Sequence, residues 1–111
     1  MNKEVKVKIL KILLVMKDIE LSNVEIKMFF EILKRQKEEV YHSSGQAREE
    51  ICKKLGISQI YYSKIIQKFA SVHLLSQLKR GYYEIDKDIL YAMSFGSLYL
   101  RLKENGEFSV I

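Results

Sequence analysis

The sequence predicts an α+β fold that is mainly α-helical, and three observations predict it. An amphipathic helical pattern opens at Ser22. Two more helical patterns, over 46–55 and 58–72, are joined by a tight turn at Gly56. Two strand-like runs joined by a basic turn follow over 74–85. At 111 residues, the chain has the size of a single domain with one core.

Composition limits the classes of function. Apolar residues make up 48% of the chain, enough for a core and too many for a disordered protein. The net charge of +5 favours a partner rich in phosphate. The lone cysteine excludes an intramolecular disulfide and a multi-cysteine metal cluster, and it is typical of a cytoplasmic protein. A disulfide scaffold, a zinc finger and a low-complexity protein are therefore excluded.

The N-terminal segment alternates charged and apolar side chains over 4–9, which predicts a half-buried strand leading into a short apolar helix over 10–17. The apolar run 9–16 is too short for a membrane span, which takes about 20 residues. Because Lys11 also interrupts it, a signal peptide is not expected. We expect no membrane partner.

The next helix is predicted to begin at Ser22, because Glu25 stands three residues later and completes a capping box. We expect it to end near Glu38 or Glu39 and a very short strand to follow at 40–42. Its core face carries apolar side chains at helical spacing: Ile26, Phe29, Phe30 and Leu33.

A helix-turn-helix follows the loop Ser43-Ser44-Gly45, which supplies the N-cap of the first helix. This helix (46–55) and the second helix (58–72) are joined by the turn 56–57, whose glycine suits the positive φ common at a helix end. Cys52 falls where the two helices come closest and a small side chain is required. We therefore interpret it as a buried packing residue and not as a nucleophile.

The second helix has a face without acidic residues. Its core side is predicted to hold Tyr62, Ile65, Ile66, Phe69 and Val72. The remaining side chains are Gln59, Tyr61, Ser63, Lys64, Gln67 and Lys68. Such a face can approach DNA phosphates without repulsion. Glutamine can pair with adenine and lysine can reach guanine in the major groove, while Ser63 can bond a phosphate oxygen.

A hairpin with a cationic tip comes directly after this helix. Its strands are expected at 74–78 and 82–85, around the turn Lys79-Arg80-Gly81. Helix, helix-turn-helix and basic hairpin in that order are the pattern of a winged helix. Lys79 and Arg80 would contact the DNA backbone or the adjacent minor groove, and Arg48 would clamp a phosphate. The predicted contacts to double-stranded DNA are Arg48, Ser58, Gln59, Tyr61, Ser63, Lys64, Gln67, Lys68, Lys79 and Arg80.

Several segments together resemble the winged-helix plasmid replication proteins of the RepL type. They are Val5-Lys6-Val7, Leu21-Ser22, Ile26-Lys27, Arg48-Glu49-Glu50-Ile51, Leu55-Gly56-Ile57-Ser58 and Arg80-Gly81-Tyr82-Tyr83-Glu84-Ile85. The resemblance implies sequence-specific binding at a plasmid or phage replication origin, with the second helix and the wing reading DNA. It carries this role to Ser58, Ser63, Lys64 and Arg80.

Three departures from the family pattern leave other roles open. Asp86-Lys87 replaces the family's Asn-Pro pair, Tyr61-Tyr62 replaces Thr-Val, and His73 stands where glycine is usual. One alternative is a winged-helix transcriptional repressor. Another is a protein-interaction module that does not bind DNA, indicated by the pairs Tyr61-Tyr62 and Tyr82-Tyr83 because aromatic residues concentrate at protein interfaces.

The residue types that catalysis and cofactors need are missing from the pattern. His42 and His73 have no metal-ligand spacing, and the glycines stand singly, so no phosphate-cradling loop is formed. We expect no enzyme activity, no cofactor and no metal. A replication role would then depend on binding DNA and recruiting the replication machinery. A repressor would likewise depend on binding DNA and acting on the transcription machinery.

The single domain divides into three parts. They are an N-terminal strand and helix at 1–21, a winged-helix core at 22–93 and a C-terminal extension at 94–111. In the extension, Asn105-Gly106 lies between alternating runs and predicts a β-hairpin, with a helix over 94–104 as the alternative. Apolar faces of both extensions are available for a homodimer that would match a palindromic site.

Overall fold

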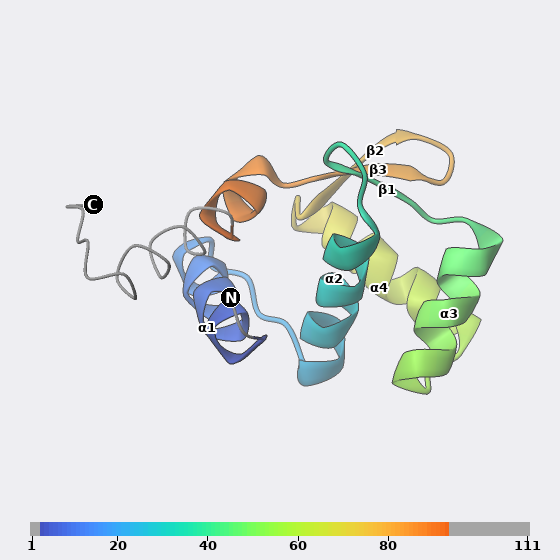
Figure 1. The fold of residues 1–111 in the computed structure, drawn as a ribbon, viewed down its shortest axis with the longest axis horizontal. Helices are drawn as coiled ribbons and strands as arrows, with labels where there is room; N and C mark the ends of the chain where they lie inside the picture. Colours follow the sequence, from blue (N-terminus) through green and yellow to red (C-terminus); the bar gives the residue numbers. More distant parts are fainter. Residues whose placement is uncertain (1–2, 94–111) are drawn as a thin grey trace, which may run out of the picture. The chain divides into compact units, whose positions relative to one another are not determined.

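The computed structural model describes residues 3–93 (Figure 1). Their contacts define two compact units. The first combines the residues before Leu21 with those after Asp86, and the second runs from Leu21 to Asp86. The C-terminal hairpin predicted within 94–111 lies outside the described residues. Within 3–93 the chain is α+β and mainly helical, as predicted, and it contains no helix with the length and hydrophobicity needed to cross a bilayer.

The first unit along the chain corrects the prediction of an N-terminal strand. Residues 4–9 are not a strand but the first half of one helix, α1 (Lys3–Met16). The alternation of charged and apolar side chains over 4–9 suggests a strand. The helix is favoured because it places Leu10 and Leu14 one turn apart on the same side, where both are buried. Residues 87–93 are also helical, and Lys17 pairs with Asp88 at 3.0 Å.

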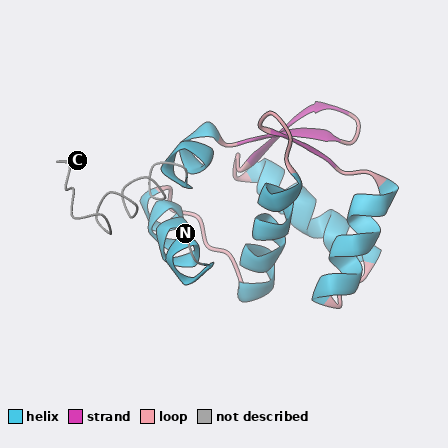
Figure 2. Cartoon of the chain, in the orientation of Figure 1, coloured by secondary structure: helices cyan, strands magenta, loops and turns pink. Residues whose placement is uncertain are grey.

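The second unit runs in the order α2 (Asn23–Arg35), β1 (Val40–His42), α3 (Gly45–Leu55), α4 (Gln59–Ser71), β2 (Leu75–Lys79) and β3 (Tyr82–Ile85). Figure 2 shows the three strands gathered beside the helices. They form an antiparallel sheet in the order β1-β3-β2. The pairing of β2 with β3 shifts register between Gln77 and Lys79, which is an irregularity of the β-bulge type.

The capping box at the start of α2 is confirmed. The Ser22 hydroxyl accepts from the Glu25 amide at 3.2 Å, and the Glu25 carboxylate accepts from the Ser22 amide at 2.8 Å. The predicted end near residues 38 and 39 is wrong, because α2 stops at Arg35. Glu38 and Glu39 instead take φ values of 53° and 69° in the turn that leads to β1.

The core of the second unit is formed by side chains from all of its helices and strands. The rings of Phe29 and Phe69 meet edge to face, with 5.4 Å between their centroids. Other fully buried side chains are Met28, Ile32, Tyr41, Ile51, Ile65, Leu74, Leu75 and Ile85. Helix α4 is thereby held by its apolar side, which leaves its opposite side to solvent.

Both helices of the predicted helix-turn-helix are followed by a left-handed residue. Gly56 has φ +67°, as its position at the turn predicts. His73 has φ +64°, and the amide of Leu74 donates to the Phe69 carbonyl at 2.9 Å, which is the hydrogen bond of a Schellman motif. His73 therefore has a structural role at the end of α4.

Replacing His73 with glycine is expected to stabilise the protein by about 0.5–1 kcal/mol. A residue with a Cβ atom pays about 1–2 kcal/mol in the left-handed region, and the entropy of glycine in the unfolded chain offsets part of that gain. Chemical denaturation at equilibrium measures the change. His73→Ala keeps the unfavourable conformation, so an equal gain in that variant would contradict this explanation.

A buried carboxylate joins α2 to α3. Glu31 is almost inaccessible to solvent, and its oxygens lie 2.7 Å from Arg35 Nη1, 3.1 Å from Lys54 Nζ and 3.3 Å from Lys34 Nζ. Burial raises the pKa of Glu31, but the hydrogen bonds from these three cations outweigh burial and lower the pKa to about 2. The carboxylate therefore stabilises the fold only while it is ionised.

The Glu31→Gln variant is expected to lose on the order of 2–3 kcal/mol of unfolding free energy at neutral pH. Because the folded pKa lies below the ordinary value, this contribution is complete above pH 4.5 and disappears as the pH falls towards 2. Denaturation curves of wild type and variant should converge over that window. Glu49→Gln, at an exposed position of α3, is the control and should change little. A constant gap between wild type and Glu31→Gln down to pH 2.5 would contradict this assignment.

Candidate nucleic-acid interface

The solvent-facing side of α4 is free of acidic residues. Ser58 caps the helix by accepting from the Tyr61 amide at 3.0 Å, and no Asp or Glu occurs between Gln59 and Ser71. Gln59, Ser63, Lys64 and Gln67 are exposed, as predicted, and so is Ile60, at 73% of its maximum area. We call these five side chains the α4 face.

Two residues of the predicted contact set lie just beyond the edge of the α4 face that Lys64 forms. At 100° per residue, Tyr61 and Lys68 are about 160° and 140° away from Ser63, but about 60° and 40° away from Lys64. Lys68 Nζ pairs with Glu25 Oε1 at 2.9 Å. Burial raises the pKa of Glu25, and hydrogen bonds from Lys68 and Ser22 reverse the effect, so the pKa is lowered overall. Lys68 therefore ties α4 to the start of α2.

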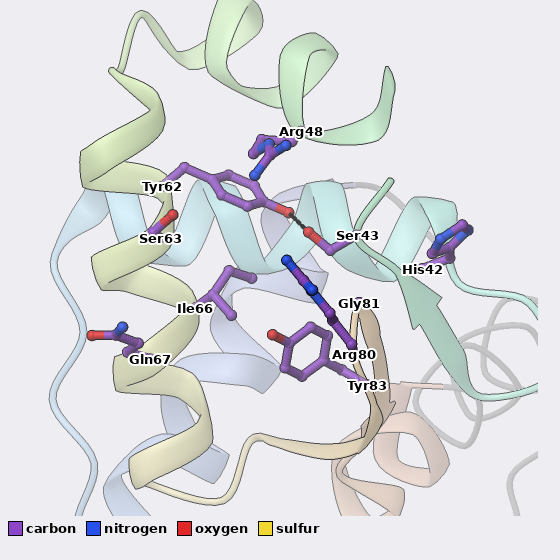
Figure 3. A pocket seen from close by; sticks show the side chains of 10 residues that line it. All are labelled: His42, Ser43, Arg48, Tyr62, Ser63, Ile66, Gln67, Arg80, Gly81 and Tyr83. Atoms are coloured by element: carbon purple, nitrogen blue, oxygen red, sulfur yellow. Dashed lines mark hydrogen bonds between the residues drawn. The ribbon is translucent and has the colours of Figure 1, made fainter. Parts of the chain in front are cut away.

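A pocket of about 550 Å³ lies beside the α4 face (Figure 3). It is open to solvent and is bordered by α4, by the end of β1 with its connection to the first turn of α3, and by the β2–β3 turn with β3. Four of the predicted contact residues line it, namely Arg48, Ser63, Gln67 and Arg80. The other lining residues are His42, Ser43, Tyr62, Ile66, Gly81 and Tyr83, so no carboxylate lines the pocket.

Ser43 joins three parts of this pocket. Its amide donates to the Gly81 carbonyl at 2.7 Å, which connects β1 to the β2–β3 turn. Its hydroxyl lies 2.7 Å from the Tyr62 hydroxyl, which in turn lies 2.7 Å from the Tyr41 hydroxyl. Burial is the main reason that the pKa values of both tyrosines are raised, so both remain neutral donors and acceptors. The side chain of Ser43 thus connects α4 to the sheet.

Arg48 is placed on the first turn of α3, beside Tyr62 (Figure 3). Its Nε atom is buried and has no hydrogen-bond partner within residues 3–93. Cys52, one turn later, is buried at the seam between α3 and α4, and its Sγ lies 3.7 Å from the Ser58 carbonyl, as its predicted packing role requires. Burial raises the pKa of its thiol, which disfavours a nucleophilic thiolate.

The β2–β3 hairpin carries the predicted cationic tip. Lys79 Nζ lies 4.4 Å from the centre of the Tyr82 ring, and the His42 ring stacks on Tyr82 at 4.1 Å and 5°. Because β3 lies between β1 and β2, His42 and Lys79 flank Tyr82. Arg80, at the turn itself, lines the pocket.

Sequence reasoning did not single out His42, Ser43 or Ile60 as interface residues. His42 and Ser43 reach the site through the pairing of β1 with β3, which no local pattern reveals. Ile60 could have been found, because its helical angle places it between Gln59 and Lys64 on the exposed side. Within 3–93, no group of three His, Cys, Asp or Glu side chains could hold a metal ion.

The two tyrosine pairs differ in exposure. Tyr62 is 2% exposed and belongs to the core, whereas Tyr61 is 40% exposed. Tyr82 is engaged by His42 and Lys79, and Tyr83 lines the pocket. Of these four tyrosines, Tyr61 is therefore the most accessible to a protein partner.

Tyr62→Phe is expected to lower the unfolding free energy by about 1–3 kcal/mol, because it removes a hydroxyl that both Tyr41 and Ser43 contact inside the fold. The Tyr41→Phe/Tyr62→Phe double variant should lose less than the sum of the two single variants, since no tyrosine hydroxyl is then left without its partner. Urea denaturation of the four proteins measures this coupling. Strict additivity would show that the two hydroxyls act independently.

Comparisons with known proteins add no assignment to this geometry. No family model, curated protein or solved structure matches the chain. The evidence on function is therefore the arrangement itself: an acid-free helix face beside an arginine-lined pocket and a basic hairpin turn.

Proposed function

We propose that residues 21–86 form a winged-helix unit that binds double-stranded DNA. In this proposal α3 and α4 are the helix-turn-helix, α4 enters the major groove, and the β2–β3 hairpin is the wing. The observation that carries it is the α4 face, which is free of acid and continues through Ser63 and Gln67 into a pocket lined by two arginines. Phosphates can approach this surface without meeting a carboxylate.

The chemistry of the α4 face suits base recognition. Gln59 and Gln67 can each make paired hydrogen bonds to adenine, and Lys64 can reach the acceptors of guanine. Ile60 offers an exposed apolar surface for the methyl group of thymine. Ser63, at the edge of the pocket, would bond a phosphate and set the register of the helix on the duplex.

The wing supplies positive charge on a second element. Arg80 lies at the pocket, where it would contact a phosphate, and Lys79 is held over Tyr82 on the hairpin. Contacts from α4 and from the wing would then fall on different parts of one duplex. Ser58 acts in this arrangement as the cap that fixes the start of α4.

For the biological role, we propose origin binding in the manner that the resemblance to RepL-type replication proteins implies, with transcriptional repression as the alternative. In both roles the protein would act in the cytoplasm as a homodimer on a two-fold site and recruit or block other proteins. The double-stranded DNA contact is common to the two roles, so it is the property to test first.

Combining Lys64→Ala with Arg80→Ala is expected to weaken duplex binding and to reduce the slope of log affinity against log salt by up to about two units, because two positive charges that displace counterions from the duplex are lost. Fluorescence anisotropy with a random-sequence duplex, titrated with salt, measures both quantities. Lys27→Ala with Lys37→Ala removes the same charge from exposed positions outside α4 and the wing, and should leave the slope nearly unchanged.

An unchanged affinity and slope in the Lys64/Arg80 variant would exclude the α4 face and the wing as the contact surface. If the wild-type protein fails to bind random duplex DNA at about 50 mM salt, where phosphate contacts are strong, DNA binding itself is wrong. A protein-interaction role through the exposed Tyr61 side of α4 would then be favoured.

A further inference from the structure

We propose that the pocket between α4, the start of α3 and the β2–β3 turn is a binding site for one phosphate group, held between Arg48 and Arg80. The phosphate belongs either to a DNA strand or to a free phosphorylated ligand. If the phosphate belongs to DNA (the DNA form), the inference rests on the proposed function and assigns one phosphate contact to this pocket. If it belongs to a free ligand (the free-ligand form), the inference does not depend on DNA binding.

The charge of the pocket favours an anion. The guanidinium groups of Arg48 and Arg80 come from different elements and line the same space, and no acidic side chain lines it. Neither arginine forms an ion pair with a carboxylate of residues 3–93. By contrast, Arg35 is paired with both Glu31 and Glu50. The pocket therefore holds two guanidinium groups that no carboxylate of residues 3–93 neutralises.

Arg48 also has an unused donor. Its Nε–H is buried without a hydrogen-bond partner in residues 3–93, although buried polar groups in folded proteins are almost always bonded. A guanidinium presents its donors in a planar fork that matches the oxygens of a phosphate. Because Nε itself is inaccessible to solvent, the other N–H groups of the Arg48 guanidinium would make the contact to phosphate, and the Nε–H signal would report the change around it.

The walls of the pocket are already fixed before a ligand arrives. Ser43 holds Gly81 through its amide and Tyr62 through its hydroxyl, so the β2–β3 turn and α4 are joined across the pocket. Gly81 has φ +82°, a conformation that glycine accepts readily, and it directly follows Arg80. Little ordering of the backbone is therefore left for binding to impose, and the cost that remains is ordering the exposed side chains of Arg80 and Gln67.

The size and remaining chemistry indicate a nucleotide unit in place of a bare ion. A volume of about 550 Å³ lies in the range of small-molecule sites and leaves room for a sugar beside the phosphate. Ser63 and Gln67 add polar groups from α4, and the Tyr83 ring adds an aromatic surface. These groups fit both a stretch of DNA backbone and a free nucleoside monophosphate.

The test uses the full-length ¹⁵N-labelled protein and two kinds of ligand. One arm titrates inorganic phosphate and then a nucleoside monophosphate, and follows the Arg48 Nε–H signal with the amides of Ser63 and Gly81 by NMR. The other arm measures binding of random duplex DNA by anisotropy.

Both arms include Arg48→Gln, Arg80→Gln and the control Lys27→Gln, at an exposed position of α2. Thermal unfolding of each variant verifies the fold, and Arg80 at the turn provides a second variant if the Arg48 variant is unstable.

The free-ligand form is supported if the free ligand shifts the NMR signals of the site and if both arginine variants bind it at least tenfold more weakly, while the control does not. Absence of these shifts, with a tenfold or greater loss of duplex affinity in both variants, supports the DNA form. Free-ligand binding by a protein that fails to bind DNA leaves the pocket standing and overturns the proposed function. No free-ligand binding, with duplex affinity and salt slope unchanged in both variants, overturns the pocket and the wing contact of Arg80, and leaves only the α4 face of the proposed function.

Discussion

The candidate interface depends on the contacts of one small residue, Ser43. Its amide holds the β2–β3 turn at Gly81, and its hydroxyl holds Tyr62 on α4. The Tyr41 hydroxyl adds a second contact to Tyr62 from β1, which is paired with β3, so directional hydrogen bonds join the sheet to α4 at two positions. The position of Arg80 relative to the α4 face therefore follows from hydrogen bonds made at the end of β1.

Most elements of the second unit could be predicted from the sequence because their signals are local. The Ser22–Glu25 capping box, the Ser58 cap and the left-handed Gly56 each involve residues within four positions of one another. The alternation and the glycine turn at Gly81 identify the hairpin in the same way. Local signals of this kind do not depend on the rest of the fold.

The remaining features arise from contacts between residues distant in sequence. The strand expected at 4–9 is part of α1, because a short alternating run is compatible with both structures and the burial of Leu10 and Leu14 decides between them. The pairing of β1 with β3 brings His42 and Ser43 to the site, across about forty residues of chain, and no periodicity announces it. The sequence therefore predicts four of the residues that line the pocket, but not that they surround a common space.

The register shift in β2 has a further consequence for how this sheet meets other molecules. In the order β1-β3-β2, both outer strands present unpaired backbone groups, which can attract a strand from another chain. β1 has only three residues, and the irregularity between Gln77 and Lys79 interrupts the regular row on β2. Both outer strands of this sheet are thus poor templates for edge-to-edge aggregation.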